Sequence, residues 1–211
     1  IVRTAQSFKH LKACLVKRLA PSGFVGAGDM AWRRVHDTVI VVEFQRDRER
    51  TTKDEIKFTI NLGISADVLR TVAAAAGGPP PEDVPPPEKC HWRQRLGRLL
   101  PAQSDVWWAV RDEQSAQAVC DEIATGLITI ALPRVEAMAS SNALVDSWQE
   151  DRGQGLTEYE RRAYLAKLLT ALGRKEEAKA AVRALEDASI GKSWAASAAY
   201  DVTDLRRQLL N

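Results

Sequence analysis

The sequence contains few cysteines, and those present are not arranged as a framework. Cys14, Cys90 and Cys120 are far apart and odd in number, and no two of them form a C-x-x-C pair. This spacing argues against a disulfide framework and against a zinc site. We therefore expect all three cysteines to pack as free thiols, as in a protein of a reducing compartment such as the cytoplasm.

Long apolar segments are also missing. No run of about 18 apolar residues is present, so we expect no transmembrane helix. The N-terminal apolar stretch is interrupted by Lys9, Lys12, Lys17 and Arg18, which differs from the continuous apolar core of a signal peptide. These observations predict a protein without a membrane segment.

A strong charge of either sign is absent, since 30 basic and 28 acidic residues leave a net charge of +2. Nucleic-acid-binding proteins usually show a clear basic excess, so we do not expect nucleic acid as the partner. With 211 residues and an apolar fraction of 45%, the chain can bury a core without metal or disulfides. Its length suits one large domain, or one domain with a small appendage.

Catalytic motifs are lacking as well. His10, His36 and His91 have no metal-ligand spacing, and no nucleophile elbow or phosphate-binding loop is present. The glycine-rich residues 23–28 follow a helical pattern, whereas a phosphate loop follows a strand. For the cysteines and histidines, a thiolate pair of Cys90 with His10 or His36 stays open. We expect no cofactor and no metal, and a binding module rather than an enzyme.

The periodicity of the first half predicts a helix, three strands and a second helix. The third strand is the clearest, because Ile56, Phe58, Ile60, Leu62 and Ile64 alternate with polar residues or glycine. Short connections between the strands favour antiparallel hairpins. The expected elements are a helix over 4–20, strands over 29–35, 38–46 and 55–65, and a helix over 66–76. Residues 77–87 contain six prolines and two glycines and predict an exposed loop.

The second half predicts two further strands, over 91–97 and 105–111, and then helices. Asp112 is placed to cap a long helix that Pro133 should kink or end. A shorter helix is expected over 141–149. Glycines at 151–155 mark a boundary, after which Thr157-x-x-Glu160 forms a capping-box pattern. We predict an α+β sheet domain over 1–150, with about five antiparallel strands against an N-terminal helix and a long helix, and an all-helical appendage over 151–211.

Two resemblances follow from short motifs. Residues 172–185 resemble one tetratricopeptide-like helical hairpin, although no second copy appears at the 34-residue period of such repeats. Over about residues 5–135 the chain resembles the bacterial family catalogued as domain of unknown function 4304. The motifs that carry this resemblance are, in order, Pro21–Phe24, Ala31–Arg34, Val41–Gln45, Phe58–Ile64, His91–Gly97 and Trp107–Trp108. The family implies a sheet flanked by helices and supplies no activity.

The strand alternation places polar side chains on the sheet face opposite the expected helices. The candidate binding face consists of Arg33, Glu43, Gln45, Asn61, Arg93, Arg95 and Trp107. Arginine forks beside an aromatic ring suit recognition of a carboxylate, a phosphate or a protein. The same residues also suit plain cross-strand ion pairs on a solvated face, each worth under about 1 kcal/mol. Both interpretations stay open from the sequence.

Three functions are compatible with this face. The first is a non-catalytic module that recognises a protein partner through the polar sheet face or the helical tail. The second is a small-molecule or nucleotide-binding domain, or an enzyme, with a site built from Arg33, Glu43, Arg95 and Trp107. A deep pocket that contains Glu43 together with Arg33 and Arg95 would favour it. The third is RNA binding through the basic first helix and the sheet aromatics, against which the near-neutral charge counts.

Overall fold

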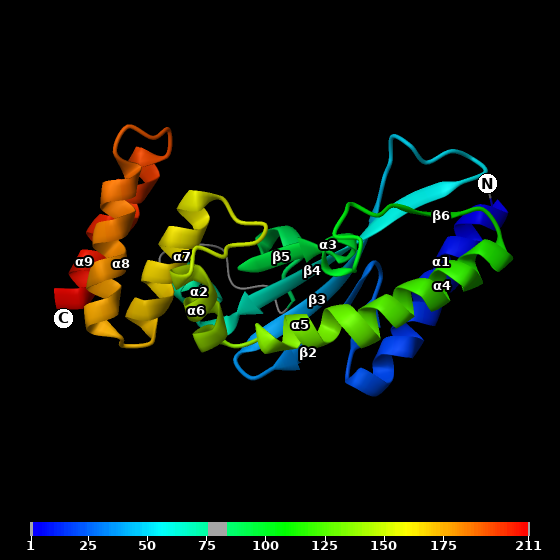
Figure 1. The fold of residues 1–211 in the computed structure, drawn as a ribbon, viewed down its shortest axis with the longest axis horizontal. Coiled ribbons are helices and arrows are strands. Elements are labelled where there is room, and N and C mark those ends of the chain that lie inside the picture. Colours follow the sequence, from blue (N-terminus) through cyan, green and yellow to red (C-terminus); the bar gives the residue numbers. More distant parts are fainter. Residues whose placement is uncertain (1, 76–83, 211) are drawn as a thin grey trace.

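A six-stranded antiparallel sheet forms the centre of the molecule, as the computed structural model shows for residues 2–75 and 84–210 (Figure 1). Strands β1 to β5 follow one another in order, and β6 pairs with β4 beyond the end of β5. The strands are β1 (Val25–Ala27), β2 (Met30–Val35), β3 (Thr38–Arg46), β4 (Ile56–Ala66), β5 (Trp92–Arg95) and β6 (Trp108–Val110). The α+β class and the antiparallel pairing are as the hairpin spacing predicts.

One face of the sheet is covered by two helices, α1 (Val2–Leu19) and α4 (Glu113–Gly126), which run side by side (Figure 1). The apolar side chains of alternate β4 residues enter a core with Leu11 and Leu15 of α1, which are fully buried. Phe8 packs edge-on against Phe58 with 5.1 Å between ring centroids. The apolar face of β4 and the apolar face of α1, each predicted from its sequence period, therefore pack together in one core layer.

A disulfide joins these helices, contrary to the sequence expectation. Cys14 of α1 and Cys120 of α4 are bonded across a sequence separation of 106, with their Cα atoms 6.5 Å apart. The prediction of three free thiols is wrong for this pair, because helix packing brings together positions that spacing treats as unrelated. Cys90 alone of the three is free, and it is buried. The cysteine count consequently no longer argues for a reducing compartment.

The long helix begins as its capping residues predict. The Asp112 side chain accepts a hydrogen bond from the Ser115 backbone N–H, and the Asp112 backbone N–H donates one to the Ser115 side chain. After α4 the helix continues through a π-helical turn (Leu127–Ala131) into α5 (Leu132–Ala137). Pro133 follows this turn as the second residue of α5, and the wider spacing of the π-helical turn accommodates its missing backbone N–H. It therefore does not end the helical path.

Several short elements were not expected from the sequence. These are β1, the helix α3 (Leu96–Leu99) and the 3₁₀ turns η1 (Ala20–Ser22) and η2 (Pro87–Lys89). Two other helices, α2 (Asp67–Ala75) and α6 (Ser141–Gln149), match their predicted ranges. Of the proline-rich stretch, residues 77–83 lie outside the described part. Its end, residues 84–87, lies on the sheet, where Val84 packs with Val39, Val41 and Cys90.

Three helices form the tail: α7 (Glu158–Ala171), α8 (Lys175–Ser189) and α9 (Ala195–Leu210). The predicted capping box of Thr157 and Glu160 is present, and Gly173 follows α7 with a φ of 71°, as a C′ glycine does. Leu168 and Leu169 of α7 join the core of the sheet. The likeness to a tetratricopeptide unit, and the division into 1–150 and 151–211, stay predictions. Among the described residues no helix is long and apolar enough to cross a bilayer.

Candidate functional site

A row of polar side chains crosses three strands on the face opposite α1 and α4. Glu43 of β3 lies opposite Asn61 of β4, and Asn61 lies opposite Arg95 of β5. Because side chains alternate along a strand, these residues point away from the core that contains Val42 and Leu62. The row therefore places an acid, an amide and a guanidinium beside one another.

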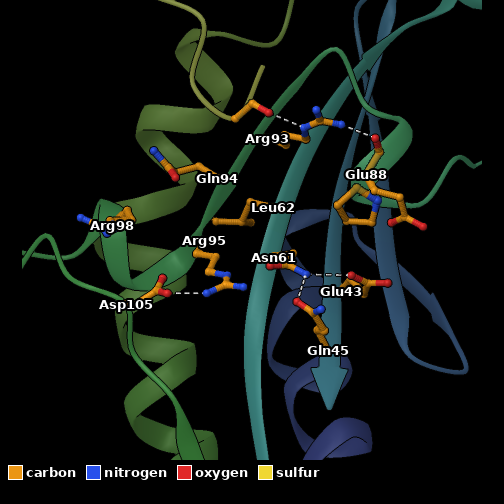
Figure 2. A pocket seen from close by; sticks show the side chains of 12 residues that line it. Glu43, Gln45, Asn61, Leu62, Glu88, Arg93, Gln94, Arg95, Arg98 and Asp105 are labelled. Atoms are coloured by element: carbon orange, nitrogen blue, oxygen red, sulfur yellow. Dashed lines mark hydrogen bonds and ion pairs between the residues drawn. The ribbon is translucent and has the colours of Figure 1, made fainter. Parts of the chain in front are cut away.

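This row forms the floor of a pocket of about 530 Å³, which we call the sheet-face pocket (Figure 2). Its walls come from three segments distant in sequence: the η2 turn, the loop after α3 and the link before α7. The lining residues are Glu43, Gln45, Asn61, Leu62, Pro87, Glu88, Arg93, Gln94, Arg95, Arg98, Asp105 and Gly155. The lining is thus mostly charged or amide in character.

Asn61 organises the acidic side of the floor. Its Nδ2 donates to Glu43 Oε2 and to Gln45 Oε1, both at 2.9 Å. Burial raises the pKa of Glu43, the Asn61 hydrogen bond partly offsets this rise, and the nearby carboxylates of Glu88 and Asp29 add to it. Glu43 is therefore a partly desolvated acid with an acidic neighbour, the environment that a cation would stabilise.

The basic side of the pocket contains two arginines with different degrees of restraint. Arg95 forms an ion pair with Asp105, and its guanidinium lies 5.2 Å from the centroid of the Trp107 ring. Arg98 donates from Nη1 to the carbonyl of Gln103 at 3.2 Å and has no carboxylate partner among the described residues. The stacked Arg95 is oriented, whereas Arg98 keeps unused donors.

Arg93 has a different role, because its guanidinium N–H groups already donate to residues in the pocket walls. Its Nε donates to the Gly155 carbonyl at 2.6 Å, its Nη1 to the Glu88 carbonyl, and its Nη2 to both oxygens of Glu160. This guanidinium joins β5, the η2 turn and the start of α7. We regard Arg93 as a residue that positions the pocket walls.

Arg33, predicted on this face, lies on the other one. It pairs with Ile40 in the sheet register and so shares the helix-covered face. There it donates to the Ser22 carbonyl at 2.6 Å and forms an ion pair with Glu136 of α5. The prediction was wrong because the face of β2 depends on its register, and one residue of shift reverses every side chain.

The other predicted residues lie in or beside the pocket. Glu43, Gln45, Asn61, Arg93 and Arg95 line it. Trp107 stands outside the lining and contacts Arg95 and Arg50 through its ring.

The sequence reasoning missed the lining residues Leu62, Pro87, Glu88, Gln94, Arg98, Asp105 and Gly155. Arg98 could have been noticed from the repeated basic residues after Arg93 and Arg95. No sequence pattern marked Gly155 as a pocket residue, because its position depends on how the helical tail packs against the sheet.

The two reactive side chains near this face are held in unreactive forms. Burial raises the pKa of the Cys90 thiol to about 12, and burial with the charge of Arg70 lowers the pKa of His91 to about 4. Neutral His91 accepts the Ala66 N–H at Nδ1 at 3.0 Å. His10 lies on α1, across the sheet from Cys90. The proposed thiolate pair gains no support. No cluster of three or more potential metal ligands occurs within residues 2–75 and 84–210.

Comparison with known proteins gives one family. A family model described as a domain of unknown function (DUF4304) matches residues 15–137. No curated protein and no solved structure matches the chain. The matched region contains every lining residue of the sheet-face pocket except Gly155.

Proposed function

The chain belongs to the DUF4304 family, and we propose that it is a non-catalytic module that binds a small polar molecule in the sheet-face pocket. The observation that carries this proposal is the row of Glu43, Asn61 and Arg95 on the floor of a hollow of about 530 Å³. A volume of this size falls within the range of about 300–1,000 Å³ typical of small-ligand sites.

The shape of the face favours a small molecule over a flat protein surface. The η2 turn, with Pro87 and Glu88, and the link before α7, with Gly155, border the row and make an open, concave site. Acceptors at Glu43, an amide at Asn61 and donors at Arg95 offer directional hydrogen bonds in one concave site. The unreactive states of Cys90 and His91 support binding without covalent chemistry.

The test is amide NMR of the labelled protein with a panel of amino acids, short peptides, nucleosides and sugar acids. We expect at least one compound to shift resonances of β3, β4 and β5. The double variant Glu43→Gln/Arg95→Met should lose these shifts. Its matched control is Glu186→Gln/Arg206→Met, which removes an exposed ion pair between α8 and α9 and should keep them. A panel that leaves the pocket resonances unmoved contradicts the proposal.

Recognition of a protein partner is the second candidate, and a groove on the tail favours it. This groove of about 400 Å³ lies between α6, α7 and α8 and has Leu165, Leu169 and Ala181 on its floor. Its mixed apolar and charged lining suits an amphipathic helix. Ala180→Arg, in the groove, should abolish retention of a partner purified from source cells. Ala196→Arg, on the exposed surface of α9, is the control.

A further inference from the structure

The two sides of the sheet-face pocket differ in their excess charge. Glu43 and Glu88 lie on one side with Arg93, whose guanidinium is already bonded to two carbonyls and Glu160, whereas Arg95 and Arg98 lie on the other side with Asp105 (Figure 2). The pocket is therefore bipolar across the strands. A ligand with one charge would satisfy only one of its sides.

Each side retains charged atoms without a partner. Glu43 uses only Oε2, toward Asn61, and the Glu88 carboxylate has no ion pair within the described residues. On the opposite side Arg95 meets Asp105 through one terminal nitrogen, and Arg98 meets only a carbonyl. Glu88 and Arg98 are exposed, whereas Glu43 and Arg95 are half-buried, so the latter two would gain most from a ligand group of opposite charge.

Amide groups occupy the space between the two sides. Asn61 lies between Glu43 and Arg95 in the cross-strand row, and Gln45 is hydrogen-bonded to it. Asn61 Nδ2 already donates to Glu43 and Gln45, so the groups left for a peptide bond are the Asn61 Oδ1 acceptor and the Gln45 Nε2 donor. The middle of the pocket therefore matches a peptide bond, and its ends match opposite charges.

The sheet geometry limits the length of the occupant. Neighbouring strands lie about 4.8 Å apart, so the backbones under Glu43 and Arg95 are separated by about 10 Å. An extended chain covers about 3.5 Å per residue, so two or three residues bridge the gap, whereas one amino acid does not.

Building on the proposed function, we propose that the occupant is a di- or tripeptide with free ends. Glu43 and Glu88 hold its ammonium group, and Arg95 with Arg98 holds its carboxylate. The raised pKa of Glu43 agrees with this assignment, because an ammonium group would supply the missing counter-charge. The glutamate side should therefore discriminate against a blocked N-terminus, and the arginine side against a blocked C-terminus.

The experiment measures dissociation constants by calorimetry for alanyl-alanine and trialanine, for their N-acetylated and C-amidated forms, and for alanine. In the unaltered protein we expect each cap to weaken binding by about tenfold or more, with alanine bound more weakly than the peptides. Glu43→Gln should remove the penalty of the N-acetyl cap alone. Arg95→Met should remove the penalty of the amide cap alone, and Arg206→Met should remove neither.

The outcomes separate this inference from the proposed function. If capped and free peptides bind equally, or if none binds while another polar compound shifts the pocket resonances, the peptide assignment is overturned and the pocket remains a ligand site. If nothing in either panel binds there, both proposals fail. The capped peptides are compared on the unaltered protein, so the result does not depend on how a variant folds.

Discussion

Arg93 Nη2 of β5 donates to both carboxylate oxygens of Glu160 at the start of α7, at distances of 3.0 and 3.1 Å. The same carboxylate accepts the backbone N–H of Thr157 at 2.7 Å. Burial alone would raise the pKa of Glu160, but the hydrogen bonds from Thr157 and the charge of Arg93 outweigh it and lower that pKa. The Glu160 side chain thus caps α7 and, through Arg93, joins the tail to the pocket wall.

This pair predicts that Arg93→Lys loosens the link before α7. Lysine cannot reproduce the planar fork that reaches the Gly155 carbonyl and Glu160 together. We expect a loss of about 1–3 kcal/mol in the free energy of unfolding and faster hydrogen exchange in residues 153–160. The control is Arg162→Lys, whose ion pair with Glu158 lies within α7. Unchanged exchange in this segment would show that Arg93 does not hold it.

Gly155 should tolerate no side chain. Its φ is +75°, and an added Cβ would lie 2.3 Å from the Arg93 carbonyl oxygen. Gly191 has a φ of +71°, but a Cβ added there would have no atom within 4 Å. An alanine at this position therefore has the same backbone strain as one at Gly155 but no steric clash. In thermal unfolding we expect Gly191→Ala to cost about 1 kcal/mol and Gly155→Ala distinctly more. Equal losses in the two variants would mean that only the backbone conformation matters.

The disulfide between α1 and α4 predicts a reductant-sensitive stability. Cys14 and Cys120 close a loop with a sequence separation of 106, for which loop-closure entropy gives about 5 kcal/mol. Urea unfolding of the protein should shift to lower concentration when a phosphine reductant is present. Cys14→Ala/Cys120→Ala should unfold early with or without reductant. The prediction fails if reductant leaves the midpoint of the unaltered protein in place.

His91 predicts a loss of stability in mild acid. Its pKa in the folded protein is about 4, below its ordinary value of 6.5, so the unfolded chain binds the proton more readily. The contribution is complete above pH 6.5 and is lost as the pH falls toward 4, by roughly 3 kcal/mol at most. His91→Gln keeps an acceptor for the Ala66 N–H and should flatten this part of the profile, measured by urea unfolding at each pH. The control is His36→Gln, in the turn between β2 and β3. Parallel pH profiles of stability for the His91 variant and the unaltered protein would show that His91 does not cause the loss in acid.

The regular elements and their caps could be predicted because their signals are local. The alternation in β4 and the capping residues Asp112 and Thr157 act within a few residues of the chain, and the structure confirms each of them. The same alternation placed Glu43, Asn61 and Arg95 on one face. The alternation failed for Arg33. Strand β2 is short and does not alternate cleanly between apolar and polar residues, so no local pattern sets its register against β3.

The sequence by itself determined the α+β class, the main helices and strands, and the polar character of one sheet face, since periodicity and capping are properties of neighbouring residues. Only the tertiary structure decided that Cys14 meets Cys120, that Arg33 turns to the helices, and that Gly155 closes the sheet-face pocket. Each of these depends on segments brought together by burial of apolar surface, which is not directional and leaves no mark in the spacing of the residues it joins.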